Sequence, residues 1–226
     1  MADDLLVDLR RTDLFGSADP ALLTPLAAKA FMRRFAPGQV VCTEGEPSDH
    51  LYVVRDGRVR VLMRSAHGDL VILSVLGPGD TLGELSIIDG EPRSASVEAL
   101  TAAQLVALRA ADVLAVLRAD PDLLMAVAAQ LAAMVRRLSG GTADLVFLDL
   151  PRRLAKLLLS EGQPASTGPP RVDMGMSQAG LAARLGVSRP ALNRALGSLI
   201  RRGWIDHDGG SLLLTDPDAL RRFADS

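Results

Sequence analysis

The spacing of apolar residues divides the chain into stretches with different periodicities. Residues 5–34 show helical patterning, which is interrupted at Gly16 and Pro20. From residue 37 to residue 109 the apolar residues gather instead in short runs rich in β-branched side chains, at 39–43, 51–54, 59–63, 71–73, 94–100 and 105–108. After Arg109 the helical period returns.

Turn signals separate the β-rich runs. Clusters that contain Gly, Asp or Pro lie at residues 45–47, 56–57, 68–69, 77–80 and 89–92. Residues 58–61 alternate polar and apolar side chains, as a half-buried strand does. Strands that recur at this spacing predict an antiparallel sandwich or barrel. With the helices on either side, the expected fold class is α+β.

A long helix with an apolar stripe is expected after residue 119. Asp120 can cap its N-terminus, and Pro121 fits its first turn. Apolar residues recur every seven positions, and a second set follows each by three: Leu124, Leu131, Leu138 and Leu145, with Val127, Met134, Gly141 and Leu148. Such a seam favours a parallel coiled-coil dimer, and one long helix packed on its own domain is the alternative. Gly140 and Gly141 each cost about 1 kcal/mol and predict a soft point.

A further helix is expected after a short hinge. Asp149 is its predicted N-cap, and the helix extends through Pro151 to Leu159. Residues 161–170 are rich in Gly, Pro and Ser and predict a loop. A domain boundary is therefore expected at about Leu148.

Composition places the chain among ordinary folded proteins. Hydrophobic residues make up 48% and charged residues 23%, a balance that excludes a disordered chain. The acidic start lacks the basic and apolar regions of a signal peptide, and no run reaches 18 uninterrupted apolar residues. We therefore expect a cytoplasmic protein that does not enter a membrane.

The cysteine and histidine residues predict no metal site. Cys42 is the single cysteine, which excludes an intrachain disulfide and a four-thiolate iron–sulfur cluster within one chain. His50, His67 and His207 occur in turn-like contexts, so we expect them at the surface. No nucleophile, base and orienting group come together in the sequence, and we expect no enzyme.

The charges are distributed unevenly along the chain. The formal net charge is −2, yet residues 171–205 contain six arginines against one aspartate. This segment therefore carries +5 and the remainder −7. A basic segment on an acidic body is expected when one domain binds a polyanion, and a solvated helical surface is the alternative.

Several anion-binding groups lie close together in residues 83–95. A short helix after Gly83 would present free backbone N–H groups to an anion. Arg93 can return to the same place with a charged fork that suits phosphate, and Ser94 adds a hydroxyl donor. Glu84 offers an acceptor for a ribose hydroxyl group. Together these residues predict a site for a phosphate-containing ligand.

The pattern from residue 177 predicts a helix-turn-helix. Ser177 caps a first helix through Leu185, Gly186 supplies a tight turn, and Ser188 caps a second helix to about Arg202. The interior between the two helices is expected to contain Leu181, Leu185, Val187, Leu192, Leu196 and Leu199. Residues 203–206 and 211–214, on either side of two glycines, predict a small β-wing. A three-helix bundle that does not bind DNA is the alternative.

The exposed N-terminal face of the second helix predicts base contacts in the major groove. Arginine suits guanine, with about 1–3 kcal/mol of discrimination for each good pair. The predicted DNA-binding residues are Ser177, Gln178, Ser188, Arg189, Pro190, Asn193 and Arg194.

With these motifs the chain resembles the cyclic-AMP receptor protein/FNR (CRP/FNR) family of bacterial transcription regulators along nearly its whole length. Residues 83–85 and 93–95 resemble the family's phosphate-binding cassette, and residues 187–189 and Arg194 resemble its recognition helix. The resemblance implies an N-terminal antiparallel β-roll in residues 1–118, a dimerisation helix and hinge in 119–148 and a winged helix-turn-helix in 149–226. It also implies turn glycines at Gly38, Gly45 and Gly57.

The resemblance further implies a role for each cassette residue. Arg93 and Ser94 would hold the cyclic phosphate of the effector, and Glu84 the ribose 2′-hydroxyl group. The cyclic-nucleotide set is completed by cassette positions and by two adenine-side positions on the long helix: Gly83, Leu85, Ala95, Leu138 and Ser139. Leu138 stands where cyclic-AMP binders usually have a polar residue, and Pro190 where many members have a base-reading Glu.

The expected protein is a homodimer whose affinity for a palindromic operator on double-stranded DNA is controlled allosterically. The expected effector is cyclic AMP, with cyclic GMP as the second choice and no metal, and RNA polymerase is an expected partner. A constitutive DNA-binding dimer with a vestigial or differently selective pocket stays open, as does a haem sensor. A cyclic-nucleotide module attached to an enzyme or channel is a third class, but the chain has no catalytic signature to support it.

Overall fold

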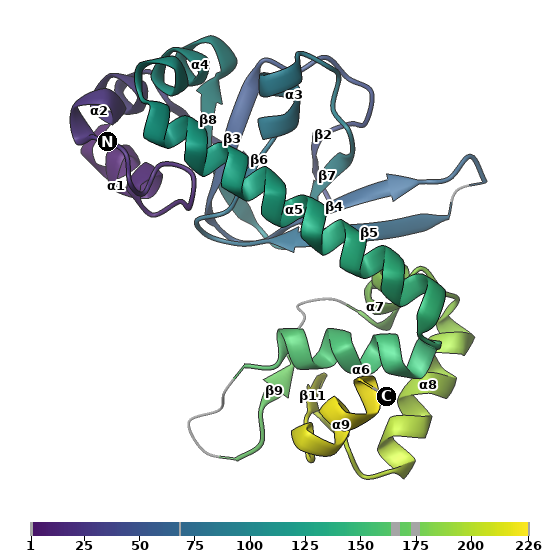
Figure 1. Cartoon of the computed structure of the whole chain (residues 1–226). Coiled ribbons are helices and arrows are strands. Elements are labelled where there is room, and N and C mark those ends of the chain that lie inside the picture. The colour runs from purple at the N-terminus through teal and green to yellow at the C-terminus, as the bar shows by residue number, and fades with distance from the viewer. Residues whose placement is uncertain (1, 68, 164–167, 173–176, 226) are drawn as a thin grey trace. The chain divides into compact units, whose positions relative to one another are not determined.

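The computed structural model describes residues 2–67, 69–163, 168–172 and 177–225 (Figure 1). The chain forms two units, Met1–Val135 and Arg136–Ser226, which are described in turn. The division falls within α5 (Pro121–Phe147), the longest of the described helices.

The N-terminal unit contains two four-stranded antiparallel sheets with strand orders β1-β8-β3-β6 and β2-β7-β4-β5. Helices flank these strands on both sides in the sequence. Before α5 the elements are α1 (Ala2–Arg10), α2 (Pro20–Lys29), β1 (Phe31–Phe35), β2 (Val40–Cys42), β3 (His50–Asp56), β4 (Val59–Arg64), β5 (Leu70–Leu76), β6 (Thr81–Leu82), α3 (Glu84–Asp89), β7 (Ser96–Ala99), β8 (Ala103–Arg109) and α4 (Ala110–Ala119). The predicted α+β class and antiparallel sheets are confirmed, and each β-rich run contains a strand.

Two strands, β1 and β6, were not predicted from the periodicity of the sequence. The helical expectation for residues 5–34 is wrong at its end, because β1 begins at Phe31 and pairs with β8. This edge strand has the exposed Arg33 and Arg34 where a central strand would be apolar. Strand β6 has only two residues, which pair with Tyr52 and Val53. Neither strand has enough alternation to be recognised in the sequence.

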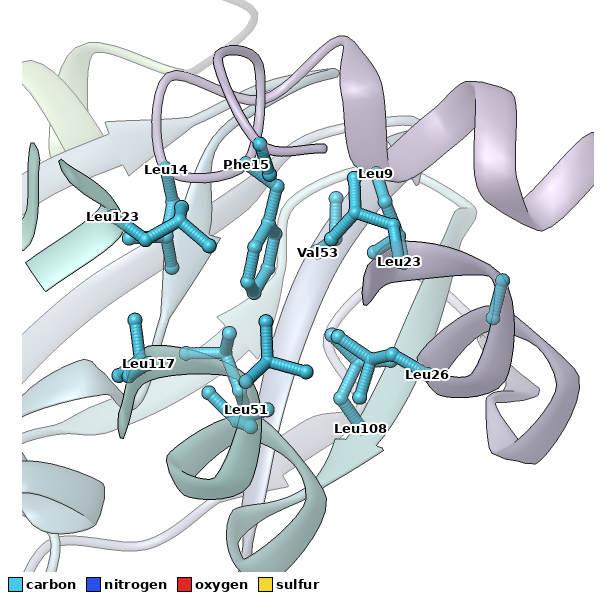
Figure 2. Close-up of a cluster of buried hydrophobic side chains, with 14 of the residues drawn as sticks. Leu9, Leu14, Phe15, Leu23, Leu26, Leu51, Val53, Leu108, Leu117 and Leu123 are labelled. Atoms are coloured by element: carbon cyan, nitrogen blue, oxygen red, sulfur yellow. The ribbon is translucent and has the colours of Figure 1, made fainter. Parts of the chain in front are cut away.

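Strand β3 separates two apolar cores. Leu51 and Val53 point into a core that α1, α2 and α4 also line (Figure 2). Tyr52 and Val54 belong to the other core, which is formed by side chains of both sheets. Because successive side chains of a strand point to opposite faces, this one strand gives the N-terminal unit both an outer helical core and an interior between the sheets.

Helix α5 begins as predicted and runs without interruption. The Asp120 carboxylate accepts from the backbone N–H of Asp122 at 3.0 Å, which confirms the predicted cap. The helix continues through Gly140 and Gly141 to Phe147, so the glycines do not break it. Its length and hydropathy would also suit a membrane span. Its early residues Leu123, labelled in Figure 2, and Val127, however, are buried in the core that α1, α2 and α4 line.

The C-terminal unit contains the predicted helix-turn-helix and wing. After the end of α5 its elements are α6 (Leu150–Glu161), β9 (Arg171–Val172), α7 (Gln178–Leu185), α8 (Arg189–Arg201), β10 (Asp206–Asp208), β11 (Ser211–Leu213) and α9 (Pro217–Ala224). The strands form one antiparallel sheet of order β10-β11-β9. The predicted interior residues of the two helices are buried, apart from the half-buried Val187. Strand β9 and helix α9 were not predicted.

Candidate functional site

The segment between β6 and α3 has the geometry of an anion-binding helix start. Gly83 is the N-cap of α3 with φ 95°, a conformation that L side chains rarely adopt. Gly83 has no side chain that could cap the helix, and the backbone N–H groups of Gly83 and Glu84 lie near the Glu84 carboxyl. The predicted short helix after Gly83 is therefore confirmed. The turn glycines Gly38, Gly45 and Gly57 also have positive φ.

Arg93 is buried beside Gly83, and its backbone is fixed on both sides. Its side chain is folded inward, since the residue is only 6% exposed. The Arg93 N–H donates to the carbonyl of Glu46 at 2.9 Å, and the Arg93 carbonyl accepts from Gly45 at 2.8 Å. Its Nη2 donates to the carbonyl of His50 at 2.6 Å. The arginine thus returns from ten residues along the chain, as predicted.

Two buried polar atoms of this cassette have no hydrogen-bond partner among the described residues. Nη1 of Arg93 and Oε2 of Glu84 are buried, and neither has a hydrogen-bond partner in the described part of the chain. A Cβ atom on Gly83 would overlap Nη1 and lie 2.8 Å from Cζ of Arg93. Burial raises the pKa of Glu84, against the opposing effects of backbone hydrogen bonds and the Arg93 charge. A buried donor and a buried acceptor without partners indicate a polar ligand that satisfies both.

The other predicted cassette residues lie close by in the chain. Ser94 is exposed, Leu85 is half-buried and Ala95 is buried. Leu138 and Ser139 are exposed on α5, in the other unit. Their role at the adenine end of the ligand stays a prediction.

Two residues of β3 that the sequence analysis did not assign to the site, His50 and Tyr52, lie beside Arg93. His50 was expected at the surface in a turn, which is wrong, because it lies half-buried in β3 and pairs with Asp49. Its ring stacks on the ring of Tyr52, with centroids 6.2 Å apart. The Arg93 guanidinium lies 5.7 Å from the Tyr52 ring centroid. The contact between Tyr52 and Arg93 spans more than forty residues of sequence, so no local pattern could have indicated it.

The helix-turn-helix forms a second candidate site. Oγ of Ser177 accepts from the N–H of Gly180, and Oγ of Ser188 accepts from that of Ala191, each at 3.4 Å. Gly186 joins the helices with φ 65°. The N-terminal face of α8 leaves the predicted DNA-binding residues exposed: Arg189, Pro190, Asn193 and Arg194. Ser177, Gln178 and Ser188 are exposed as well.

Two arginines that the sequence did not single out brace this motif. Nη1 of Arg153 on α6 donates to the carbonyl of Leu185 at 3.3 Å, at the end of α7. Arg184 forms an ion pair with Glu161 at the end of α6. Both contacts connect α6 to α7 and so fix the first helix of the motif on the domain core.

Each site falls within a family match. Residues 32–120 match the cyclic nucleotide-binding domain, and residues 152–223 match the Crp-like helix-turn-helix domain. A "CRP-like cAMP-activated global transcriptional regulator" of Mycobacterium tuberculosis (strain ATCC 25618 / H37Rv) is 34% identical over 219 residues, which cover 96% of this chain and 98% of the relative. The chain belongs to the CRP/FNR family of transcription regulators. Because this family regulates transcription, the CRP/FNR chain is a DNA-binding regulator and not an enzyme.

Solved structures of CRP/FNR regulators have the same fold. A CRP/FNR-family transcriptional regulator of Thermus thermophilus is 26% identical and superposes with a TM-score of 0.71, covering 87% of this chain and 99% of that one. A c-di-GMP-responsive global regulator, CLP, of Xanthomonas campestris has a TM-score of 0.75 at 21% identity, covering 88% of this chain and 100% of that one. The second likeness bears on the fold alone.

Proposed function

We propose that this CRP/FNR regulator is a homodimer whose affinity for a palindromic operator is raised by a cyclic mononucleotide. The observation that supports this proposal is the Nη1 atom of Arg93, a buried charged donor that has no hydrogen-bond partner in the part of the chain that the structure describes. It faces the helix start at Gly83, where backbone N–H groups favour an anion. A cyclic phosphate carries one negative charge and acceptor oxygens, which match this single guanidinium.

The other buried atom limits the class of ligand. Oε2 of Glu84 is an acceptor, so a ligand that binds here also needs a hydrogen-bond donor. A ribose 2′-hydroxyl group beside a 3′,5′-cyclic phosphate supplies that donor. Cyclic AMP is our first choice because the Mycobacterium tuberculosis relative is described as cAMP-activated, and cyclic GMP is the second. Leu138 and Ser139 are proposed to face the base.

Exposed apolar residues of α5 support the dimer. Leu124, Leu138 and Leu145 of the predicted seam are 55%, 56% and 64% exposed. A second copy of the helix would cover these apolar side chains. Val127, also assigned to the seam, is buried in its own core instead. The proposed coiled coil therefore lies mainly along the C-terminal part of α5.

The mechanism that follows couples the two sites. The nucleotide holds Arg93 and stiffens the dimer helices, and these helices pass the change to the hinge at residues 147–149. The two α8 helices then sit about one DNA turn apart, as a palindrome requires. On the operator, in the cytoplasm, the regulator would meet RNA polymerase.

Calorimetric titration tests this proposal. We expect the wild-type protein to bind cyclic AMP or cyclic GMP saturably, with one site per protomer. Arg93→Leu should weaken binding at least about a hundredfold, because charge-assisted hydrogen bonds to a buried phosphate are lost. Arg34→Leu changes an exposed arginine in the same domain and serves as the matched control.

The alternatives predict different titrations. A wild-type protein that takes up no cyclic mononucleotide but still binds DNA would establish the constitutive dimer. Uptake of c-di-GMP alone would point to the ligand that the Xanthomonas relative answers to. Either result overturns the proposed effector.

A further inference from the structure

The Arg93 guanidinium is held in place without a carboxylate. None of the ion pairs among the described residues includes Arg93. Its Nη2 is fixed by the carbonyl of His50 at 2.6 Å, a neutral acceptor, and the nearby Glu84 carboxyl attracts its charge without forming an ion pair with it. A guanidinium that keeps its full charge attracts a phosphate more strongly than one already paired. What else supports it therefore matters for ligand binding.

The ring of Tyr52 supplies that further support. The guanidinium centre lies 5.7 Å from the ring centroid, within the range of a cation–π attraction. Tyr52 is 5% exposed, so water screens the contact little. A π-face attracts a cation without offering it a proton acceptor, and Nη1 stays free.

The direction of Tyr52 follows from the alternation of β3. Leu51 and Val53, on either side of it, point into the core shown in Figure 2. Tyr52 consequently points to the opposite face, into the interior between the sheets. The ring contacts the Arg93 side chain there, because that side chain is also buried.

The ring of Tyr52 is itself held from two directions. Its hydroxyl oxygen accepts a hydrogen bond from Nη1 of Arg33 on β1 at 2.9 Å. The His50 ring stacks on it at 6.2 Å between centroids. Movement of the ring would break both contacts, so the face toward Arg93 is fixed before any ligand arrives.

We propose that Tyr52 is a positioning residue for the effector, whose ring holds the Arg93 guanidinium with Nη1 free toward Gly83. The inference rests on the proposed function, since it takes the ligand to be a cyclic phosphate bound by Arg93. It assigns Tyr52 no contact with that phosphate.

Calorimetry on the full-length protein with cyclic AMP and cyclic GMP tests this role. Tyr52→Leu removes the ring and should weaken binding about tenfold, the size expected for a desolvated cation–π contact. Tyr52→Phe keeps the ring and loses only the bond to Arg33, so its affinity should stay within about threefold of wild type. Tyr52→Met, also without a ring, repeats the test if the leucine variant does not fold.

Non-additivity separates positioning from packing. In an Arg93→Gln background, measured at millimolar nucleotide, the change from Tyr52 to Leu should alter the remaining affinity less than about twofold. A merely structural effect would persist there in full, and that result overturns the proposal. So does a Tyr52→Leu variant that binds like wild type, or a Tyr52→Phe variant as weak as Tyr52→Leu. Wild-type protein that binds neither nucleotide overturns the proposed function, and this inference with it.

Discussion

At the scale of single residues, the effector site depends on groups that the fold leaves without partners. Gly83 makes room for the Arg93 guanidinium, and Glu84 places a carboxylate beside the same helix start. Each of these costs the free protein stability, because glycine loses more conformational freedom on folding than other residues and a buried polar atom without a partner is unfavourable. We expect a bound ligand to recover the cost of the unpartnered polar atoms.

Gly83→Ala tests the space beside Arg93. The added Cβ would overlap Nη1, so we expect cyclic-nucleotide affinity to fall at least about tenfold. Gly90→Ala is the matched control: its φ is 76°, close to the 95° of Gly83, but a Cβ there meets nothing within 4 Å. Both variants should lose about 1 kcal/mol of stability, measured by urea unfolding. Equal affinities of the two variants in calorimetry would contradict the assignment.

Glu84→Gln tests the buried carboxylate. Because burial raises the pKa of Glu84, the folded protein keeps its proton to higher pH than the unfolded chain does. Stability is therefore lost as pH rises from about 4.3, the unfolded value, through the raised pKa. Glu84→Gln should remove that loss and stabilise the free protein by about 1 kcal/mol at pH 8. Its nucleotide affinity should fall.

Urea unfolding at pH 5 and pH 8, with and without nucleotide, measures both effects of Glu84→Gln. The wild type should be less stable at pH 8 than the variant and closer to it at pH 5. A variant that is less stable than wild type at pH 8 in the absence of ligand shows that Glu84 is already satisfied.

At the scale of elements, caps and periodicity were predictable and long-range pairing was not. Asp120, Asp149, Ser177 and Ser188 could be identified as caps because a cap and its helix are neighbours in sequence. Strand β1 could not be identified in this way, because its pairing with β8, about seventy residues away, decides its conformation. The same holds within the site: the cassette is a local pattern, whereas the support of Arg93 by β3 is not.

Leu145→Glu tests the seam of α5 against an equally exposed neighbour. Leu145 is 64% exposed and lies on the predicted seam, whereas Val146, 70% exposed, lies beside it. Leu145→Glu should raise the dimer dissociation constant at least about tenfold, since each dimer loses two buried leucines. Val146→Glu should leave it within about threefold in sedimentation equilibrium. Equal effects of the two changes would exclude a heptad seam.

Pro190→Glu tests how α8 reads its half-site. Pro190 offers no acceptor, whereas a carboxylate there can accept from a cytosine amino group and add about 1–3 kcal/mol of preference. Selection on random oligonucleotides should return a new required base pair for Pro190→Glu. The control Pro190→Ala should return the wild-type site, in which Arg189 keeps its guanine. A wild-type protein that already requires the cytosine contradicts this expectation.

At the scale of the whole molecule, the charge distribution and the order of the domains assign DNA binding and effector binding to different parts of the chain. The basic segment at residues 171–205 carries +5 on a chain with −2 overall, so the polyanion meets one domain and the effector the other. A family match covers each part, at residues 32–120 and 152–223. Allosteric control therefore requires a coupling free energy between the nucleotide site and the DNA site.

That claim can be tested without knowledge of the path between the sites. If a nucleotide raises operator affinity by some factor, the operator must raise nucleotide affinity by the same factor, which we expect to be about 5- to 150-fold. Operator titrations with and without saturating cyclic AMP, and nucleotide titrations with and without operator, measure the two factors. All four need the same salt concentration, because contacts to DNA phosphates weaken steeply as salt rises. Arg93→Leu should bring both factors to about one. If the wild-type factors are already one, ligand and DNA bind independently, and there is no energetic coupling between the two domains.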